Sequence, residues 1–130
     1  MAHRFKKHYT REEARALLPK LRNWLDALAS SSAVIRETEQ QLAAFFTQAD
    51  AIGGEPVNHW VRAVAKVQSI LRAFELRAIQ IKDVERGLID FPAFIGGREV
   101  FLCWEKDEAD IEFWHEIDTG YEGRERLEES

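Results

Sequence analysis

The apolar residues of this chain change their spacing at Gly87, and that change limits the folds open to it. Before Gly87 they recur three and four residues apart, which is the period of a helix with one buried face. After Gly87 they alternate with polar residues in short stretches rich in aromatic and β-branched side chains, which is typical of strands. This order predicts an α+β fold in which two helices precede a small antiparallel sheet.

The two helices are predicted over residues 10–51 and 56–86, within a single domain that spans residues 1–130. Thr10 and Glu13 form a capping-box pattern, in which each side chain accepts a hydrogen bond from the backbone N–H of the other residue. Pro19 lies inside the first helical pattern, where it removes one backbone hydrogen bond. We therefore expect helix 1 to be kinked near Pro19, or to be short.

The connection between the helices contains Gly53-Gly54 and Pro56, residues that typically end one helix and begin the next. So short a connection predicts a long antiparallel helical hairpin that packs like a coiled coil. The residues expected in its seam are Leu21, Leu28, Leu71 and Phe74.

A second apolar stripe runs along each predicted helix. It contains Leu18, Leu25, Val34 and Phe46 on the first helix, and Val61, Ile70 and Val84 on the second. A three-stranded sheet is too small to cover all of this second stripe along both helices. We therefore predict that the helices of several copies pack together, which would make the protein a homo-oligomer.

Residues 88–117 are predicted to form a three-stranded antiparallel β-meander, and residues 118–130 a loose tail. Gly96-Gly97 has the form of a two-residue hairpin turn, because both glycines adopt positive φ readily. This turn pairs Ile95 with Arg98 across the first two strands. Pro92 cannot donate a ladder hydrogen bond, so the first strand is expected at an edge of the sheet.

The third strand is predicted to follow a four-residue loop, 106–109, which pairs Leu102 with Phe113 and Val100 with His115. In this register His115 lies on the core face and Cys103 on the opposite face. The two side chains could then not bind one metal ion within a subunit.

The face opposite the core would contain aromatic residues among acids. Phe101 and Trp114 would be exposed there, and an exposed aromatic pair in such a setting is unusual. We therefore predict an interaction face at Phe101 and Trp114 that a protein partner, the tail or a ligand covers.

A small set of polar side chains on the predicted sheet supports an alternative hypothesis, a metal- or small-ligand-binding protein and possibly an enzyme. The candidate ligand-binding residues are Asp90, Cys103, Glu112, His115 and Glu116. No zinc-ligand spacing, phosphate loop or nucleophile motif occurs, so we predict no metal ligand set, no cofactor and no catalytic residue. His115 is interpreted as a hydrogen-bonded histidine at the edge of the core, with a general base or a pH-sensitive contact as the alternatives.

The charged residues are unevenly distributed. Residues 1–87 contain 14 Lys and Arg against 10 Asp and Glu, whereas residues 88–130 contain 4 against 13. The acidic part argues against a nucleic-acid partner. The asymmetry reflects either two solvated surfaces or complementary patches on neighbouring subunits. A single cysteine, and the lack of a signal segment or a long apolar run, predict a cytoplasmic protein without membrane contact.

Four stretches together resemble a known family: TREEARALLPKLR near the start, then GLIDFP, GREVFLCW and WHEIDTGYEGR. They are similar to a bacterial domain-of-unknown-function family, number 2203. The resemblance spans nearly the whole chain and implies the same order of elements and a bacterial origin, but no reaction. From the sequence we therefore favour a non-catalytic, homo-oligomeric structural or interaction module.

Overall fold

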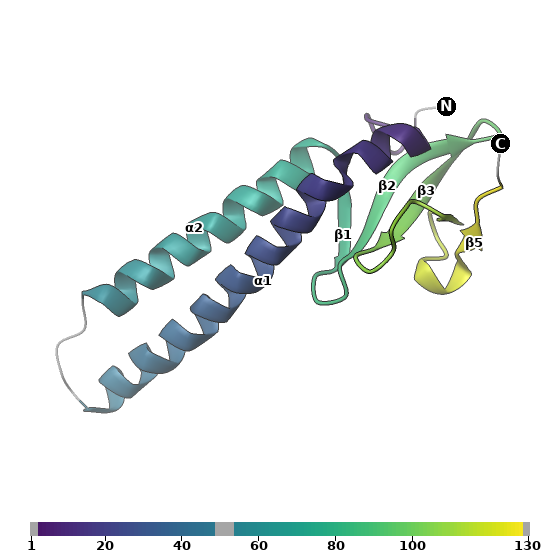
Figure 1. The fold of residues 1–130 in the computed structure, drawn as a ribbon. Helices are drawn as coiled ribbons and strands as arrows, with labels where there is room; N and C mark the ends of the chain where they lie inside the picture. Colours follow the sequence, from purple (N-terminus) through teal and green to yellow (C-terminus); the bar gives the residue numbers. More distant parts are fainter. Residues whose placement is uncertain (1–2, 49–53, 129–130) are drawn as a thin grey trace. The chain divides into compact units, whose positions relative to one another are not determined.

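The computed structural model describes residues 3–48 and 54–128, which form two compact units. One unit comprises residues 1–23 and 73–130, and the other comprises residues 24–72. The described elements are α1 (Arg11–Gln48), α2 (Glu55–Leu76), β1 (Gln80–Asp83), β2 (Leu88–Ile95), β3 (Arg98–Glu105), β4 (Phe113–Glu116), η1 (Tyr121–Gly123) and β5 (Glu125–Arg126) (Figure 1). The fold is α+β, with two helices and a five-stranded antiparallel sheet rather than the predicted three strands.

Helix α1 begins at the predicted capping box. The Glu13 N–H donates to Thr10 Oγ1 at 3.1 Å, and the Thr10 N–H donates to Glu13 Oε1 at 2.9 Å. The helix continues through Pro19 to Gln48, so it is not split there. Its predicted last residues, 49–51, lie outside the described residues.

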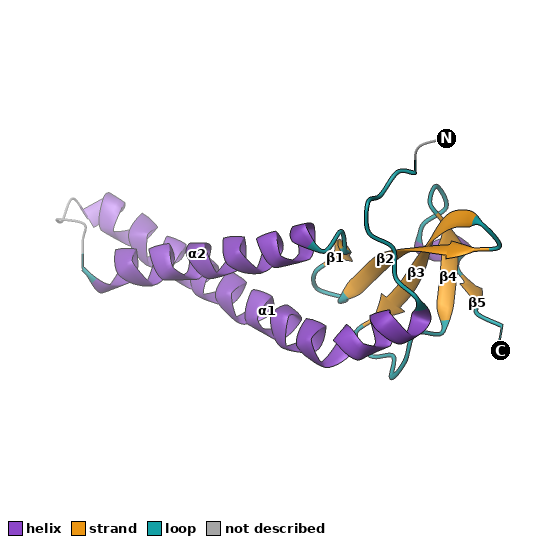
Figure 2. Ribbon diagram, turned by 90° about the horizontal axis from the view of Figure 1, so that it is seen from above, coloured by secondary structure: helices purple, strands orange, loops and turns teal. Residues whose placement is uncertain are grey.

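Within residues 24–72, α1 and α2 run side by side in opposite directions (Figures 1 and 2). Leu28 of the expected seam is buried, but Leu25 and Ile70 of the second stripe are also buried within the single chain, without the further copy that was expected to cover them. Leu71 is 43% exposed and therefore does not belong to the seam. Val34 and Val61 of the second stripe are also exposed, and the side chain of Phe46 lies outside the description.

Helix α2 ends ten residues before the predicted boundary at residue 86. Ala78 adopts the left-handed conformation with φ of 57°, and the Ile79 N–H donates back to the Phe74 carbonyl at 3.1 Å. This capping pattern usually requires glycine, so the sequence contains no stop signal. The residues that follow form β1, and Val84 lies in the turn after it rather than in a helix.

The β2–β3 hairpin has the predicted register, with Ile95 opposite Arg98 and Ile89 opposite Trp104. Gly96 and Gly97 both have positive φ, at 58° and 80°, as the two-residue turn requires. However, β2 is not an edge strand, because β1 pairs with its residues 88–90. Pro92 is accommodated because it lies beyond the end of β1.

The third predicted strand is displaced by one residue. Phe101 lies opposite His115 and Leu102 opposite Trp114, because β4 begins at Phe113 after a longer loop. The loop is held by a hydrogen bond from Trp104 Nε1 to the Glu108 carbonyl at 2.9 Å. A shift of one residue exchanges the faces of a strand. His115 therefore lies on the same face as Cys103, and Trp114 lies on the other.

The N-terminal segment covers the face on which interacting aromatic residues were predicted. The Phe5 ring lies 5.2 Å from the Phe101 ring, and the His8 ring stacks on Phe94 at 4.0 Å. Phe101 is only 3% exposed. Phe101 and Trp114 thus form no common exposed face, and the reason for expecting a partner there is lost.

The predicted loose tail is also structured, because β5 pairs with β4. Its residues 129–130 lie outside the described part of the chain.

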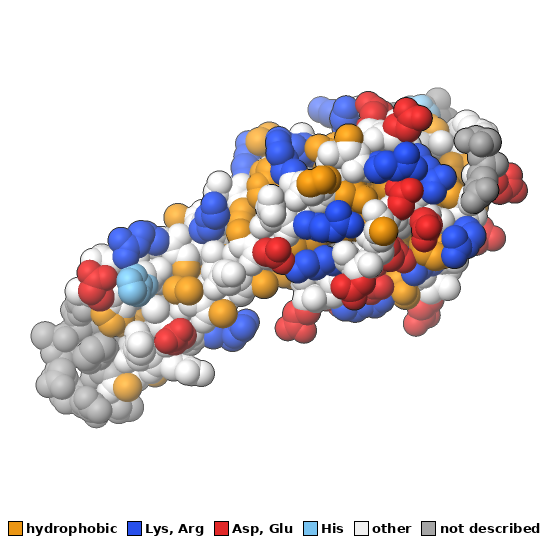
Figure 3. Space-filling model, viewed as in Figure 1, with side chains coloured by type: hydrophobic (Ala, Val, Ile, Leu, Met, Phe, Trp, Pro, Cys, Tyr) orange, Lys and Arg blue, Asp and Glu red, His pale blue; other side chains and the backbone are white. Residues whose placement is uncertain are grey.

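Charges of both signs are interspersed on the surface shown in Figure 3. Arg15 donates to Asp110 at 2.7 Å, and Arg86 lies 2.7 Å from Glu105. Both arginines come from the basic part of the sequence and both acids from the acidic part. The charge asymmetry of the sequence is therefore partly neutralised within the chain.

Candidate metal centre

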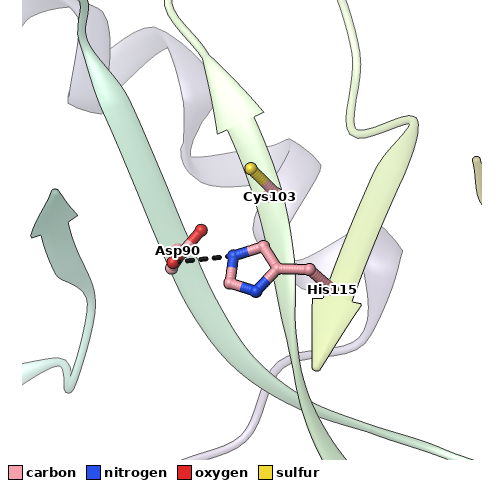
Figure 4. A group of neighbouring side chains, drawn as sticks. All are labelled: Asp90, Cys103 and His115. Carbon is pink, nitrogen blue, oxygen red and sulfur yellow. Dashed lines mark hydrogen bonds and ion pairs between the residues drawn. The ribbon is translucent and has the colours of Figure 1, made fainter. Parts of the chain in front are cut away.

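Three buried side chains meet on one face of the sheet, one from each of three adjacent strands (Figure 4). They are Asp90 of β2, Cys103 of β3 and His115 of β4, and each is at most 1% exposed. Each offers a possible metal-ligand atom, and the three atoms lie within 4.8 Å of one another. Asp90 and Cys103 lie directly opposite each other on neighbouring strands. His115 lies two residues after Phe113, which is the partner of Cys103 on β4, and therefore on the same face.

Both ring nitrogens of His115 have partners. Nδ1 lies 2.6 Å from the Glu116 carbonyl oxygen, and Nε2 lies 2.9 Å from Asp90 Oδ2. A carbonyl oxygen only accepts hydrogen bonds, so Nδ1 carries a proton. Nε2 therefore faces the Asp90 carboxylate either as a donor, in which case His115 is a cation, or as an acceptor from a protonated carboxyl group.

Asp90 is incompletely satisfied. Its Oδ1 atom is buried and has no hydrogen-bond partner within the described structure, although Oδ2 is bound to His115. A buried carboxylate oxygen without a partner is costly, and native structures contain few such atoms. Of the atoms in the cluster, Asp90 Oδ1 is therefore the one that most needs a further binding partner.

Cys103 is a neutral thiol in this environment. Burial raises its pKa to about 12, and the nearby Asp90 carboxylate acts in the same direction through its charge and a hydrogen bond with the thiol, while a hydrogen bond with Arg124 and its charge oppose the rise. Arg124 is held by an ion pair with Glu108 at 2.8 Å and stacks over the Phe113 ring at 3.8 Å. A thiol with so high a pKa is a poor nucleophile at neutral pH.

The arrangement does not form a Cys–His–Asp catalytic triad. In such a triad one ring nitrogen of the histidine bonds the nucleophile and the other bonds the acid. Here one nitrogen of His115 bonds Asp90 and the other bonds the Glu116 carbonyl. No ring nitrogen remains to take a proton from Cys103.

The donor set does fit a divalent metal ion. Thiolate, imidazole and carboxylate are the three ligand types of protein zinc sites, and metal binding deprotonates a coordinating thiol. The bond from Nδ1 to a backbone carbonyl is the usual outer contact of a metal-ligating histidine, and it directs Nε2 towards the ion. An ion among these atoms would also give Asp90 Oδ1 a partner.

A cavity of about 320 Å³ adjoins the cluster. Asp90 and His115 form part of its wall, whereas Cys103 does not line it. The remaining lining residues are Lys82, Leu88, Ile117, Asp118, Thr119, Gly120 and Tyr121. The cavity therefore borders the cluster at Asp90 and His115, while Cys103 is fully buried.

The other sequence-predicted ligand residues lie elsewhere. Glu116 is on the opposite face of the sheet and pairs with Arg98. Glu112 lies in the loop before β4, where its side chain is 43% exposed and 4.0 Å from Arg126. Trp114 lines a surface hollow beside β5. Sequence reasoning therefore named the three clustered residues among five candidates, but it separated Cys103 from His115.

Lys82, Tyr121 and Arg124 were not predicted as site residues. Lys82 was assigned to the second helix, and the other two to the tail. The sequence contains no motif that marks these three residues. They lie near the site only because of strands and turns that were not predicted.

Within the described residues, neither helix is long and apolar enough to cross a membrane. No curated protein and no solved structure matches the chain. A family model described as "Uncharacterized conserved protein (DUF2203)" matches residues 7–127, which include both helices, all five described strands and the cluster of Asp90, Cys103 and His115. The chain therefore belongs to this family, as its four sequence motifs predict.

Proposed function

We propose that this protein binds one divalent metal ion, with zinc as the best match, through Asp90, Cys103 and His115. The observation that carries the proposal is the buried, unpartnered Oδ1 of Asp90 beside a thiol and an imidazole. Zinc accepts this mixture of oxygen, sulfur and nitrogen donors, whereas magnesium and calcium prefer oxygen donors alone.

Charge supports the same assignment. With zinc bound, Asp90 and Cys103 carry one negative charge each and His115 is neutral, so the ion and its three ligands have no net charge. The neighbouring Arg124–Glu108 ion pair is neutral as well. A neutral centre avoids the large cost of an uncompensated buried charge.

The distances require only a small adjustment. Zinc bonds of about 2.0–2.3 Å place tetrahedral ligands roughly 3.3–3.8 Å apart. The longest separation in the cluster is at most 4.8 Å, and the Asp90–His115 separation is 2.9 Å. The first must shorten and the second lengthen by about an ångström or less, which side-chain rotation can provide.

The direct test is native mass spectrometry of the untagged protein after incubation with zinc and gel filtration, with competition against a chromophoric chelator to obtain the affinity. We expect one zinc ion per chain. Cys103→Ser and His115→Gln should each lose retained zinc, because each removes a ligand atom. Glu112→Gln is the matched control, since it also removes a candidate ligand but lies outside the cluster. Circular dichroism checks that each variant is folded.

Retention of the same zinc stoichiometry and affinity by Cys103→Ser and wild type would overturn the proposal. So would a wild-type protein that leaves gel filtration without metal. Cys103→Ser is informative because it replaces the ligand sulfur with an oxygen on a side chain of similar size, and circular dichroism reports whether the buried hydroxyl is tolerated.

We also propose that the helices mediate self-association. The supporting observation is that Val34, Val61 and Leu71 in residues 24–72 are 36–51% exposed. A second copy packed on these side chains would remove them from water. Analytical ultracentrifugation at micromolar concentration should show an oligomer that Val61→Glu dissociates. Sedimentation of the wild type as a monomer would refute it.

A further inference from the structure

We infer that the metal centre keeps one coordination position open to the adjoining cavity, and that this position binds a small carboxylate anion. This inference rests on the proposed zinc site and adds its ligand. It would make the centre a binding site for an exchangeable molecule rather than a closed structural site.

The number of protein ligands supports an open position. Zinc prefers four ligands, and sites with three protein ligands hold a water or another small molecule in the fourth position. Within the described residues, the cluster around Asp90 contains three candidate ligand residues. The fourth ligand must then come from outside the cluster.

The cavity determines where that ligand enters. Asp90 and His115 line it and Cys103 does not, so the open side of the ion faces the cavity. Its volume of about 320 Å³ lies at the lower end of the range for small-molecule pockets. A carboxylate with a short side chain fits this space.

Lys82 gives the cavity its preference for an anion. Its ammonium lies 5.2 Å from the centre of the Phe101 ring, and that ring lies 5.5 Å from the His115 ring. The positive charge is therefore held beside the metal ligands. Because the loaded zinc centre is neutral, the charge of an incoming anion is balanced by Lys82 rather than by the ion.

Of the two acids in the cavity wall, Asp90 is a metal ligand, and Asp118 does not cancel the charge of Lys82. The side chain of Asp118 is 95% exposed and lies 3.7 Å from Arg4, so it is directed to the solvent at the rim. Tyr121 contributes a hydroxyl group to the lining, which is a suitable donor for a second carboxylate oxygen, whereas the Thr119 hydroxyl already donates to the Glu116 carbonyl at 3.3 Å.

The test uses the protein loaded with cobalt, which replaces zinc in tetrahedral sites and gives visible absorption bands that depend on its ligands. Sodium acetate is titrated at constant ionic strength, with acetamide as the uncharged control. We expect a saturable change in the visible bands with acetate and none with acetamide. Lys82→Ala should weaken acetate binding by about fivefold. Lys66→Ala is the matched control, because Lys66 is an exposed lysine that lies in residues 24–72 and does not line this cavity.

The outcomes separate the two proposals. If cobalt gives no bands and no thiolate charge-transfer absorption in the near ultraviolet, the metal site itself is refuted and the inference with it. If these bands appear but do not respond to acetate, the metal site stands and the open position is refuted. An acetate affinity unchanged by Lys82→Ala would refute the role of the cavity in binding the anion.

Discussion

Replacement of Ile111 by alanine should strongly destabilise the sheet-bearing unit. Ile111 lies in the loop before β4, yet its side chain is 0% exposed. Removing three buried carbon atoms costs about 2.4 kcal/mol in lost burial alone. The residual cavity brings the expected loss to about 3–4 kcal/mol. This is a large share of the roughly 5–15 kcal/mol by which a domain is stable, but the variant should remain folded.

The same substitution should weaken the proposed zinc binding. The loop is fixed to the first turns of α1, because Arg11 Nε donates to the Ile111 carbonyl at 2.7 Å and Arg15 Nε donates to Asp110 at the same distance. These contacts determine where β4 begins, and the start of β4 determines which face receives His115. A loosened loop would let His115 sample positions away from Cys103.

Urea denaturation followed by tryptophan fluorescence measures the loss of stability, and chelator competition measures the affinity for zinc. Ile111→Val should cost only about 1 kcal/mol, because it removes one carbon atom. Val61→Ala, at a position that is 51% exposed, should cost less than about 0.5 kcal/mol in the monomer. An Ile111→Ala variant that loses less than about 1 kcal/mol would refute the reasoning that this side chain anchors the loop.

Three further predictions concern acid stability, the thiol and the N-terminal segment. A hydrogen bond from Arg15 lowers the pKa of Asp110, so this pair stabilises the fold above the unfolded pKa of the carboxyl group and loses that contribution as the pH falls below about 4. In the Asp110→Asn variant, the urea concentration at the unfolding midpoint should therefore depend less on pH in this range than in the wild type. Cys103, with a pKa of about 12, should not react with an aromatic disulfide reagent at about pH 8 until urea unfolds the protein. Phe5→Ala removes a ring contact with Phe101 and should speed amide exchange at Tyr9, whose N–H donates to the Pro92 carbonyl at 2.7 Å.

The parts of the fold that could be predicted are those in which a short local pattern leaves one solution. The Gly96-Gly97 turn has two residues and both need positive φ, so the pairing of β2 with β3 follows directly from it. The capping box at Thr10 is similarly local. In contrast, α2 ends at Leu76 and is followed by Ala78 in the left-handed conformation, and no glycine or other stop signal in the sequence indicates this end.

The candidate site could be predicted only in part, because its geometry depends on a loop whose length the sequence does not determine. From residue 111 to residue 117, every second residue forms one set and the residues between them are acidic or tryptophan. The first set is Ile111, Phe113, His115 and Ile117. This alternation predicts a strand that begins before Phe113. In the structure Ile111 is buried from the loop instead, which accounts for its apolar character without a place in the strand. The one-residue difference was enough to place Cys103 and His115 on opposite faces in the prediction.

Strand β4, whose register differs from the prediction by one residue, is also the strand that brings His115 into the candidate site. Of the four residues of β4, only His115 is fully buried, while its neighbours Trp114 and Glu116 are partly exposed on the other face. A strand that served only packing would bury its apolar residues and expose the histidine. Natural sequences depart from local rules mainly where function requires it. The buried His115, the Asp90 oxygen that has no hydrogen-bond partner in the described structure and the neutral Cys103 thiol therefore make this face of the sheet the place to test the proposed metal binding.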